Sequence, residues 1–292
     1  MEEQRVPEQL TSVPSCCIWC GAAGPDIVFD RSHVIPSSCG NEDLVLPPPI
    51  VCQKCNSSFT KLERTFADEP GFNFKATLLG IESGRGHRSF THDRYGFGPV
   101  LSSIAARPNK HITATIEERQ FGTDELEYVA TLVIDDVQVD VPSVRLQTTP
   151  RWCRLYSRAI HKILFEWYAY LYYVRGRVDG LAPTDSAFDA LRAFVRNGYP
   201  QQLNRPVARR FVGLSDAMDL LILPAPELVL GLDLMGTRYA CALTGELEAV
   251  ARLVLAVAES GPERTVLIHE SFEVFDKGPY TISGVWKPLM DA

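Results

Sequence analysis

Two pairs of cysteines near the start of the chain have the spacing of metal ligands. Cys17 and Cys20 form one Cys-x-x-Cys pair, and Cys52 and Cys55 form a second pair after 31 intervening residues. Two-residue spacing lets both thiolates of a pair reach one ion at about 2.3 Å, and four sulfurs complete the tetrahedral shell of a structural zinc. Cys16 adjoins the first pair and offers an alternative register with Cys20. We predict a zinc site with four cysteine ligands.

The insert between the two pairs carries a histidine at the end of an apolar segment. It is longer than the about 15–20 residues of a simple zinc ribbon, so it should have structure of its own. Residues 27–36, IVFDRSHVIP, are rich in β-branched residues and end at a proline, which predicts a short strand with His33 near its end. Asn56 follows Cys55 directly, and residues 57–66 have the composition of a helix start. Taken alone, Asn56 is also typical of a helix N-cap.

The joint pattern CxxC, SHVIP and CxxCN resembles the zinc-stapled branch of the HNH, or ββα-metal, endonucleases. The resemblance covers roughly residues 14–66. It implies that His33 is the general base that activates water and that Asn56 binds a catalytic magnesium or manganese ion, distinct from the zinc. Phosphodiester hydrolysis needs a deprotonated water and a cation on the phosphate, which a neutral imidazole and a hard-ion site with oxygen ligands can supply. The expected activity is metal-dependent cleavage of nucleic acid, with DNA as the expected substrate.

Two positions depart from the family pattern. The residue before the histidine is commonly an acidic metal ligand in this family, whereas Ser32 stands here. Asp30 lies two residues earlier, and residues two apart on a strand share a face, so Asp30 is the candidate replacement. The middle asparagine of the family, which helps to hold the loop and the histidine, corresponds to either Asn41 or Asp43. The predicted catalytic residues are His33, Asn56, Asp30 and Asn41.

The net charge of the chain is −7, but the charges are unevenly distributed. Residues 145–215 contain 12 Lys and Arg against 4 Asp and Glu. Phosphate contacts supply most of the nonspecific affinity for DNA, so this basic segment is a candidate for holding a nucleic-acid backbone. A solvated helix face is an equally good interpretation. Nearer the histidine, Lys61 and Arg64 on the expected helix are candidate phosphate contacts.

Hydrophobic periodicity predicts the elements that follow the cysteine-rich stretch. The longest helical pattern covers residues 151–175 and ends at Gly176, and its aromatic side chains favour a core position over a base-stacking surface. A second helix is expected at residues 186–197, capped by Thr184 and ended by Gly198. Residues 67–110 are glycine-rich and read as a connecting region. The remaining expected elements are strands at 111–118, 127–134, 137–141, 218–223, 228–234, 237–243, 264–269 and 280–286, and a helix at 245–258.

These patterns predict an α+β protein with three segments. Residues 1–70 form the zinc-stabilised module, residues 71–145 a linker with a small antiparallel sheet, and residues 146–292 a helical pair with an α+β domain. The sequence has no basic region followed by an apolar run at its start and no stretch of 18 uncharged apolar residues, so we expect a cytoplasmic protein without a membrane span.

Two alternatives to a free-standing nuclease remain at this point. The first is a catalytically decayed zinc module that binds nucleic acid or a protein, which Ser32 in place of an acid favours. The second is a nuclease gated through its C-terminal domain by a ligand or by oligomerisation, including assembly as a homodimer. The chemistry of the module alone does not choose a biological role.

Overall fold

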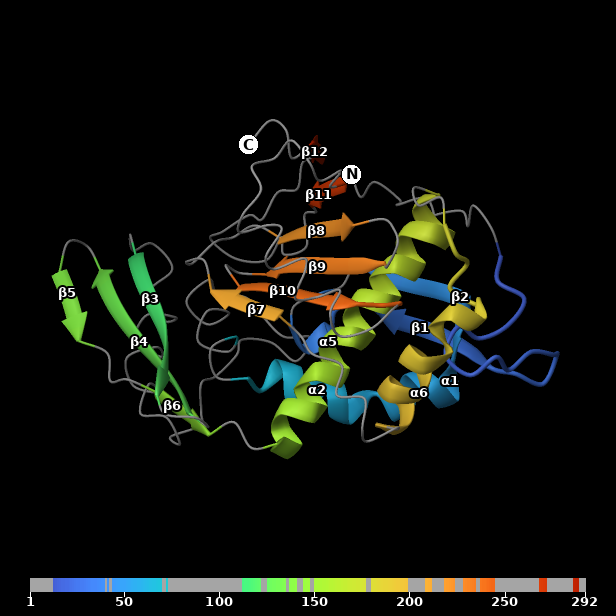
Figure 1. The fold of residues 1–292 in the computed structure, drawn as a ribbon, viewed down its shortest axis with the longest axis horizontal. Helices are drawn as coiled ribbons and strands as arrows, with labels where there is room; N and C mark the ends of the chain where they lie inside the picture. The colour runs from blue at the N-terminus through green and yellow to red at the C-terminus, as the bar shows by residue number, and fades with distance from the viewer. Residues whose placement is uncertain are drawn as a thin grey trace, which may run out of the picture.

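The computed structural model describes the N-terminal module, the central helices and the strands of two further sheets (Figure 1). The residues that it describes are 13–39, 41, 44–69, 72, 112–121, 125–134, 137–140, 144–147, 150–176, 180–198, 208–211, 218–223, 228–234, 237–244, 268–271 and 286–288. The helix expected at 245–258 lies outside these residues, as does nearly all of the glycine-rich region at 67–110.

The N-terminal module is built on an antiparallel hairpin. Strand β1 (Phe29–His33) pairs with β2 (Val45–Cys52), so the strand predicted to end at the histidine is confirmed. Between Asp30 and Ser32 the register shifts, and residues 47–50 of β2 stand against a single residue of β1. Three of these four residues are prolines, which have no N–H group to donate to the ladder. An irregularity of this kind locally bends and twists the hairpin.

Two short helices complete the module. Helix α1 (Gln53–Ser58) follows β2 directly, and α2 (Thr60–Ala67) continues after Phe59. The predicted order of strand, strand and helix is therefore confirmed, although the helical region begins earlier than expected. Cys52 occupies the N-cap position of α1, and Asn56 lies within the helix. The interpretation of Asn56 as a helix N-cap was wrong.

The second sheet has four antiparallel strands. Strand β4 (Glu125–Ile134) pairs with β3 (Ile112–Phe121) along its whole length and with β5 (Val137–Asp140) and β6 (Val144–Gln147) at its two ends. The three strands predicted between residues 111 and 141 are confirmed. Figure 1 shows this sheet set apart from the remaining elements.

The third sheet has six described strands in the order β12-β11-β8-β9-β10-β7, with every neighbouring pair antiparallel. The strands predicted in the region 218–243 are confirmed. Of the two predicted C-terminal strands, residues 268–269 and residue 286 lie in described strands, and the rest of both ranges lies outside the described residues. The bounds are β7 (Ala208–Phe211), β8 (Met218–Leu223), β9 (Val229–Leu234), β10 (Thr237–Ala242), β11 (Ile268–Ser271) and β12 (Trp286–Pro288).

The predicted helical pair is confirmed. Helix α5 (Pro150–Tyr170) continues as the π-helical turn η3 (Leu171–Arg175) and stops at Gly176, whose φ of 58° suits glycine. The turn η4 (Ser186–Phe188) leads into α6 (Asp189–Asn197). The capping side chain of this second helical region is Asp185, which accepts a hydrogen bond from Ala187 N at 2.8 Å, and not Thr184 as predicted.

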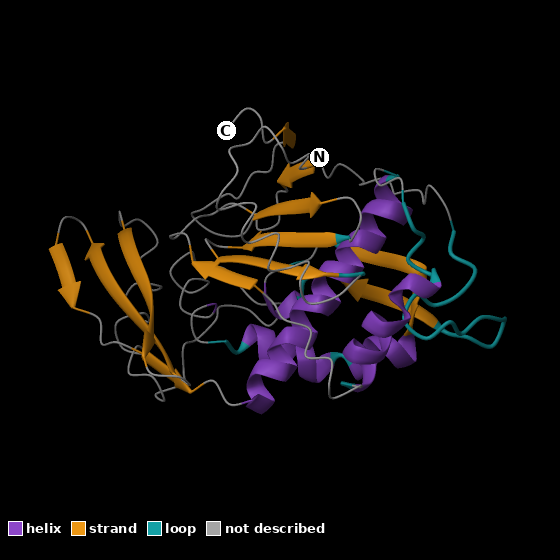
Figure 2. Ribbon diagram, in the orientation of Figure 1, coloured by secondary structure: helices purple, strands orange, loops and turns teal. Residues whose placement is uncertain are grey.

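Helix α5 lies at the centre of the described structure. It contacts β2 and α2 of the N-terminal module, α6 beside it, and β9 and β10 of the six-stranded sheet. Figure 2 shows the helices gathered on one side of this sheet. Buried residues of the first and third predicted segments belong to one hydrophobic core, as with Trp19, Trp167 and Tyr239. The α+β class is confirmed, and the module shares its core with the C-terminal half.

None of the described helices combines the length and the apolar character that crossing a bilayer demands.

Candidate functional site

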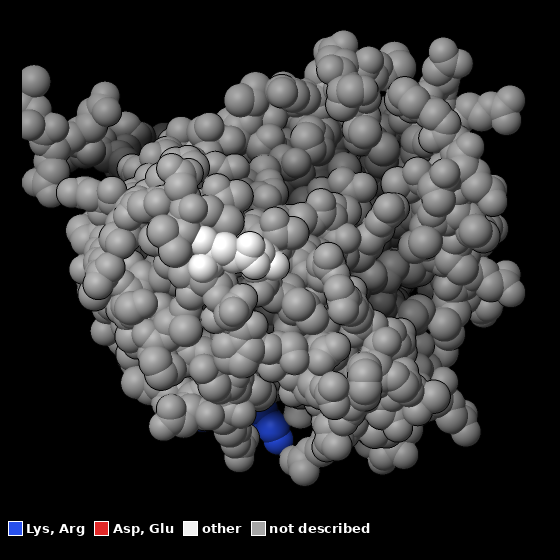
Figure 3. Space-filling view, turned by 90° about the vertical axis from the view of Figure 1, so that its left-hand side faces the viewer, with Lys and Arg blue, Asp and Glu red and all other residues white. Residues whose placement is uncertain are grey.

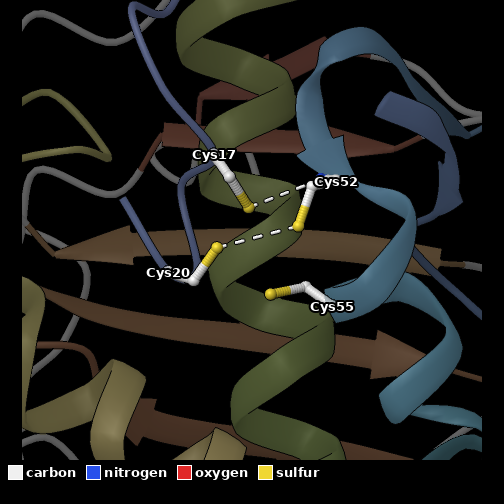
Figure 4. A group of neighbouring side chains, drawn as sticks. All are labelled: Cys17, Cys20, Cys52 and Cys55. Atoms are coloured by element: carbon white, nitrogen blue, oxygen red, sulfur yellow. Dashed lines mark hydrogen bonds between the residues drawn. The ribbon is translucent and has the colours of Figure 1, made fainter. Parts of the chain in front are cut away.

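The four predicted zinc ligands converge. The sulfur atoms of Cys17, Cys20, Cys52 and Cys55 all lie within 4.8 Å of one another, and Figure 4 shows their side chains pointing toward a common centre. The Sγ atoms of Cys20 and Cys52 are 3.7 Å apart. Four sulfurs at 2.3 Å from a tetrahedral zinc would be separated by about 3.8 Å. The donor set and its dimensions therefore fit a structural zinc, and Cys16 lies outside the group.

Local backbone structure explains why the cysteines meet. Gly21 has a φ of 68°, and its N–H donates to Cys17 O at 2.9 Å, which closes the turn around the first pair. Ile18 N donates to Ile50 O at 3.1 Å and attaches this turn to β2. The second pair spans the junction of β2 and α1, where the backbone N–H of Cys52 donates to Cys17 Sγ at 3.4 Å. Both pairs are therefore held on opposite sides of one small space.

The pKa values of three of these thiols are shifted by burial and by the neighbouring thiols. A hydrogen bond with Cys55 lowers the pKa of Cys17 to about 4, and the same bond raises the pKa of Cys55. Burial raises the pKa of Cys52. One thiolate is thus stabilised by the protons that its neighbours retain. A bound zinc would replace those protons, because metal ligation requires deprotonated thiols.

Trp19 connects the first cysteine pair to helix α5. Its ring is fully buried and packs edge-on against Phe59 and Phe165, with centroid separations of 4.8 and 4.9 Å. Its Nε1 donates to Glu166 Oε1 at 2.9 Å. Trp19 lies between the zinc ligands Cys17 and Cys20, so the position of its ring depends on the backbone that these ligands hold. The hydrogen bond from Trp19 to Glu166 depends on the same backbone.

Two of the residues predicted for catalysis, Asp30 and Asn56, meet where β1 lies beside α1. Asn56 Nδ2 is 3.3 Å from Asp30 Oδ2 and 3.0 Å from Arg31 O, and Asn56 Oδ1 is 3.2 Å from the hydroxyl of Ser32. His33 ends the same strand and is partly exposed. The structure therefore brings Asp30 and Asn56 together, and His33 lies at the end of the same strand.

The same combination of cysteine pairs, strand histidine and helix asparagine occurs in a known family. Residues 17–70 match the model of the HNH endonuclease family. The match confirms the resemblance seen in the sequence, and we refer to residues 17–70 as the HNH segment. Neither a curated protein nor a solved structure matches the chain. The family assignment therefore applies to the HNH segment.

Asn41 holds the loop that follows the histidine strand of the HNH segment. Its side chain is completely buried, and it donates to Ile35 O at 2.7 Å and to Leu44 O at 3.0 Å. Its Oδ1 accepts a hydrogen bond from Leu44 N at 2.9 Å. These contacts tie both ends of the loop to one buried side chain. Asp43, the alternative residue, lies outside the described residues.

We expect Asn41→Ala to lower the free energy of unfolding by about 2–4 kcal/mol, because it leaves buried backbone groups without their side-chain partner. Chemical denaturation at neutral pH measures the change. The matched control is Asn197→Ala, at an exposed position at the end of α6, where we expect a change within about 0.5 kcal/mol. Equal stability of the two variants would show that Asn41 does not hold the loop.

Sequence reasoning missed two residues of α5 that contact the HNH segment. Lys162 Nζ donates to His33 O at 2.7 Å and forms ion pairs of 2.9 Å with both Glu63 and Glu166. Glu166 Oε2 also accepts from Ser32 at 2.9 Å. Both side chains of α5 are completely buried, whereas Glu63 is 25% exposed. The sequence feature that could have identified them is a Lys and a Glu four residues apart within the most apolar part of the helix.

The charged state of this buried pair follows from its partners. Burial opposes the charged form of Lys162, but the carboxylates of Glu166 and Glu63 outweigh this effect, so the pKa of Lys162 is raised. Burial also raises the pKa of Glu166, against the opposing effects of Lys162 and of the Trp19 hydrogen bond. Three donors from Trp19, Ser32 and Lys162 point at Glu166. This geometry is that of an ion pair.

Several cations of the basic segment at 145–215 serve the fold. Arg158 donates to the carbonyls of Val195 and Arg196 at the end of α6, and Lys162 is buried. Figure 3 shows a face formed almost wholly by residues outside the described ones, with one described basic side chain at its lower edge. The interpretation of the segment as a phosphate-binding surface therefore does not extend to Arg158 and Lys162. Lys61 and Arg64 are exposed on α2 and remain candidate phosphate contacts.

Proposed function

We propose that the protein is a metal-dependent endonuclease that hydrolyses phosphodiester bonds of nucleic acid, with DNA as the substrate. The observation that carries this proposal is the HNH segment itself, in which Asn56 contacts the side chain of Asp30 and His33 ends the strand that carries Asp30. The exposed cations Lys61 and Arg64 of α2 are the proposed contacts to the nucleic-acid backbone.

His33 is the proposed general base. Histidine suits this role because its ordinary pKa, about 6.5, lies near the working pH, and a neutral imidazole can accept a proton from water. The backbone carbonyl of His33 is anchored by Lys162, and the loop after it by Asn41. The end of β1 is therefore fixed from both sides, which limits the positions that the imidazole can take.

Asp30 and Asn56 are the proposed ligands of a divalent cation. A carboxylate and an amide oxygen are the hard donors that Mg²⁺ and Mn²⁺ prefer, so the donor set fits. When bound, such an ion neutralises charge on the phosphate and on the leaving oxygen. Asp30 is partly exposed, and the bent hairpin brings it to Asn56 although Ser32 occupies the usual position of the acid.

The test is cleavage of supercoiled plasmid by the purified protein with Mg²⁺, Mn²⁺ or a chelator. We expect metal-dependent nicking, and we expect His33→Ala to reduce it by about 10²-fold or more, because general-base catalysis contributes about 10²–10⁴-fold. Zinc content and thermal unfolding of His33→Ala should equal those of the wild type. Undiminished cleavage by this variant would refute the assignment of the base.

A matched pair of acidic variants tests the cation site separately. Asp30→Asn should impair nicking, whereas Asp26→Asn, at an exposed position in the preceding turn, should not. Absence of cleavage by the wild type in every metal would favour the alternative of a decayed module that binds nucleic acid or a protein.

The C-terminal half is proposed to regulate the nuclease. Helix α5 anchors His33 through Lys162, and on the same helix the hydroxyl of Tyr156 donates to that of Tyr239 in β10 at 2.9 Å. One helix thus contacts both the proposed catalytic strand and the six-stranded sheet. A ligand or a second copy of the chain that displaces this sheet relative to α5 would act on the position of His33.

A further inference from the structure

The side-chain amide of Asn56 lies with its nitrogen where a cation ligand needs an oxygen. Nδ2 faces two oxygens, at 3.3 Å from Asp30 Oδ2 and 3.0 Å from Arg31 O, while Oδ1 faces the Ser32 hydroxyl at 3.2 Å. In this orientation the two oxygens are met by the partly positive N–H groups of the amide and not by a cation. Rotation of the amide by half a turn would exchange the nitrogen and the oxygen, whose shapes are similar.

The hydroxyl of Ser32 has one proton and two acceptors within reach. Asn56 Oδ1 is at 3.2 Å and Glu166 Oε2 is at 2.9 Å, and Ser32 is completely buried. The proton can be donated to only one of them at a time. The carboxylate is the closer acceptor, and hydrogen bonds to charged acceptors are roughly twice as strong as neutral ones. When Ser32 donates to Glu166, its oxygen is available to accept a proton from Asn56.

We propose that Glu166 and Ser32 are positioning residues that turn Asn56 Oδ1 toward Asp30 for cation binding. With the Ser32 proton directed to Glu166, the Ser32 oxygen accepts an N–H of Asn56, and Oδ1 joins Asp30 Oδ2 and Arg31 O. This inference rests on the proposed cation site and deepens it. It also gives a role to the serine that stands in place of the family's acid, because the acid that acts on this position comes from α5.

Glu166 is itself held in a fixed place. Trp19 Nε1 donates to Oε1 at 2.9 Å, and Lys162 Nζ lies 2.9 Å from Oε2. Both carboxylate oxygens must therefore act as acceptors, which a glutamine cannot reproduce in either orientation of its amide. The carboxylate is the side chain that satisfies Trp19, Lys162 and Ser32 together.

The experiment measures binding of Mn²⁺ to the purified full-length protein by titration calorimetry, with no nucleic acid present. The relevant signal is the one that Asp30→Asn abolishes and Asp26→Asn leaves unchanged. We expect Ser32→Ala to weaken this binding about five- to tenfold, the equivalent of one hydrogen bond. In an Asn56→Asp background the same substitution should have no effect, because a carboxylate presents an oxygen in both orientations.

The outcomes separate positioning from other roles of Ser32. If Ser32→Ala weakens Mn²⁺ binding equally in the Asn56 and Asn56→Asp backgrounds, Ser32 is a ligand or a packing residue, and the inference is overturned. Unchanged Mn²⁺ binding in Ser32→Ala would also overturn it. Glu166→Gln should weaken Mn²⁺ binding in the Ser32 background and have no further effect in the Ser32→Ala background. An effect of Glu166→Gln that persists without Ser32 would also overturn the proposed route. If Glu166→Gln does not fold, the Ser32→Ala pair decides alone.

Failure of this inference is distinguishable from failure of the proposed function. A wild-type protein that binds no Mn²⁺ at the Asp30-dependent site refutes the cation site, and with it the orientation of Asn56. A protein that binds Mn²⁺ with the expected coupling but does not nick plasmid refutes the nuclease and retains the positioning roles. A protein that nicks plasmid but shows no coupling retains the nuclease and loses the inference.

Discussion

Cys52→Ser is expected to lose its zinc and to unfold the HNH segment. Zinc binding in small zinc-dependent peptides supplies roughly 10–16 kcal/mol, which is comparable with the whole free energy of unfolding of a domain, about 5–15 kcal/mol. Cys52 joins β2 to α1 and lies 3.7 Å from Cys20. Without the metal, the turn that carries Trp19 loses its link through the sulfurs to the junction of β2 and α1 and keeps the hydrogen bond from Ile18 N to Ile50 O.

Zinc content by mass spectrometry and unfolding by circular dichroism measure this effect. The wild type should retain a stoichiometric zinc ion through purification, and tryptophan fluorescence of Cys52→Ser should shift as Trp19 becomes exposed. The matched control is Cys16→Ser, because Cys16 lies beside the first ligand pair but outside the sulfur cluster. A folded Cys52→Ser protein without zinc would refute the structural role of the metal.

The zinc ligands and the histidine strand were predictable because their signals are local. The spacing of each cysteine pair fixes which sulfurs can share an ion, and an apolar segment ended by proline delivers His33 at the end of β1. Helix α5 was predictable from its period, and its aromatic residues from Tyr156 to Tyr170 lie in the core as expected. Each of these features depends on residues close together in the chain.

The contacts of Lys162 and Glu166 were not predictable in the same way. Lys162 reaches the carbonyl of His33 and Glu166 reaches Ser32 across more than a hundred residues of chain. The sequence shows Ser32 as the loss of an acid, whereas the structure shows an acid beside it on another element. The contacts of Asn41 with backbone groups of the loop likewise could not be read from the sequence.

Lys162→Met is expected to destabilise the protein by about 3–5 kcal/mol at neutral pH, because it leaves the Glu166 carboxylate buried without its cation. Glu63, the other partner of Lys162, is 25% exposed and can be hydrated instead. The variant also loses the hydrogen bond to His33 O. Urea denaturation gives the change in free energy of unfolding. Removing the second charge in Lys162→Met/Glu166→Gln should restore much of the loss, since a neutral amide can still accept from Trp19.

The destabilisation by Lys162→Met should depend on pH in a definite direction. Burial raises the pKa of Glu166, and the charge of Lys162 opposes that rise, so the substitution moves the pKa of Glu166 further upward. A carboxyl whose folded pKa exceeds its unfolded pKa contributes stability below the unfolded value, near 4.3, and loses it as the pH rises through the folded pKa. The variant should therefore lie closer to the wild type at pH 5 than at pH 8. The double variant, which has no carboxyl at position 166, should lack this dependence.

Two results would show that the destabilisation does not come from an unpaired Glu166. One is a loss of unfolding free energy in Lys162→Met that is the same at both pH values. The other is a double variant that is no more stable than Lys162→Met.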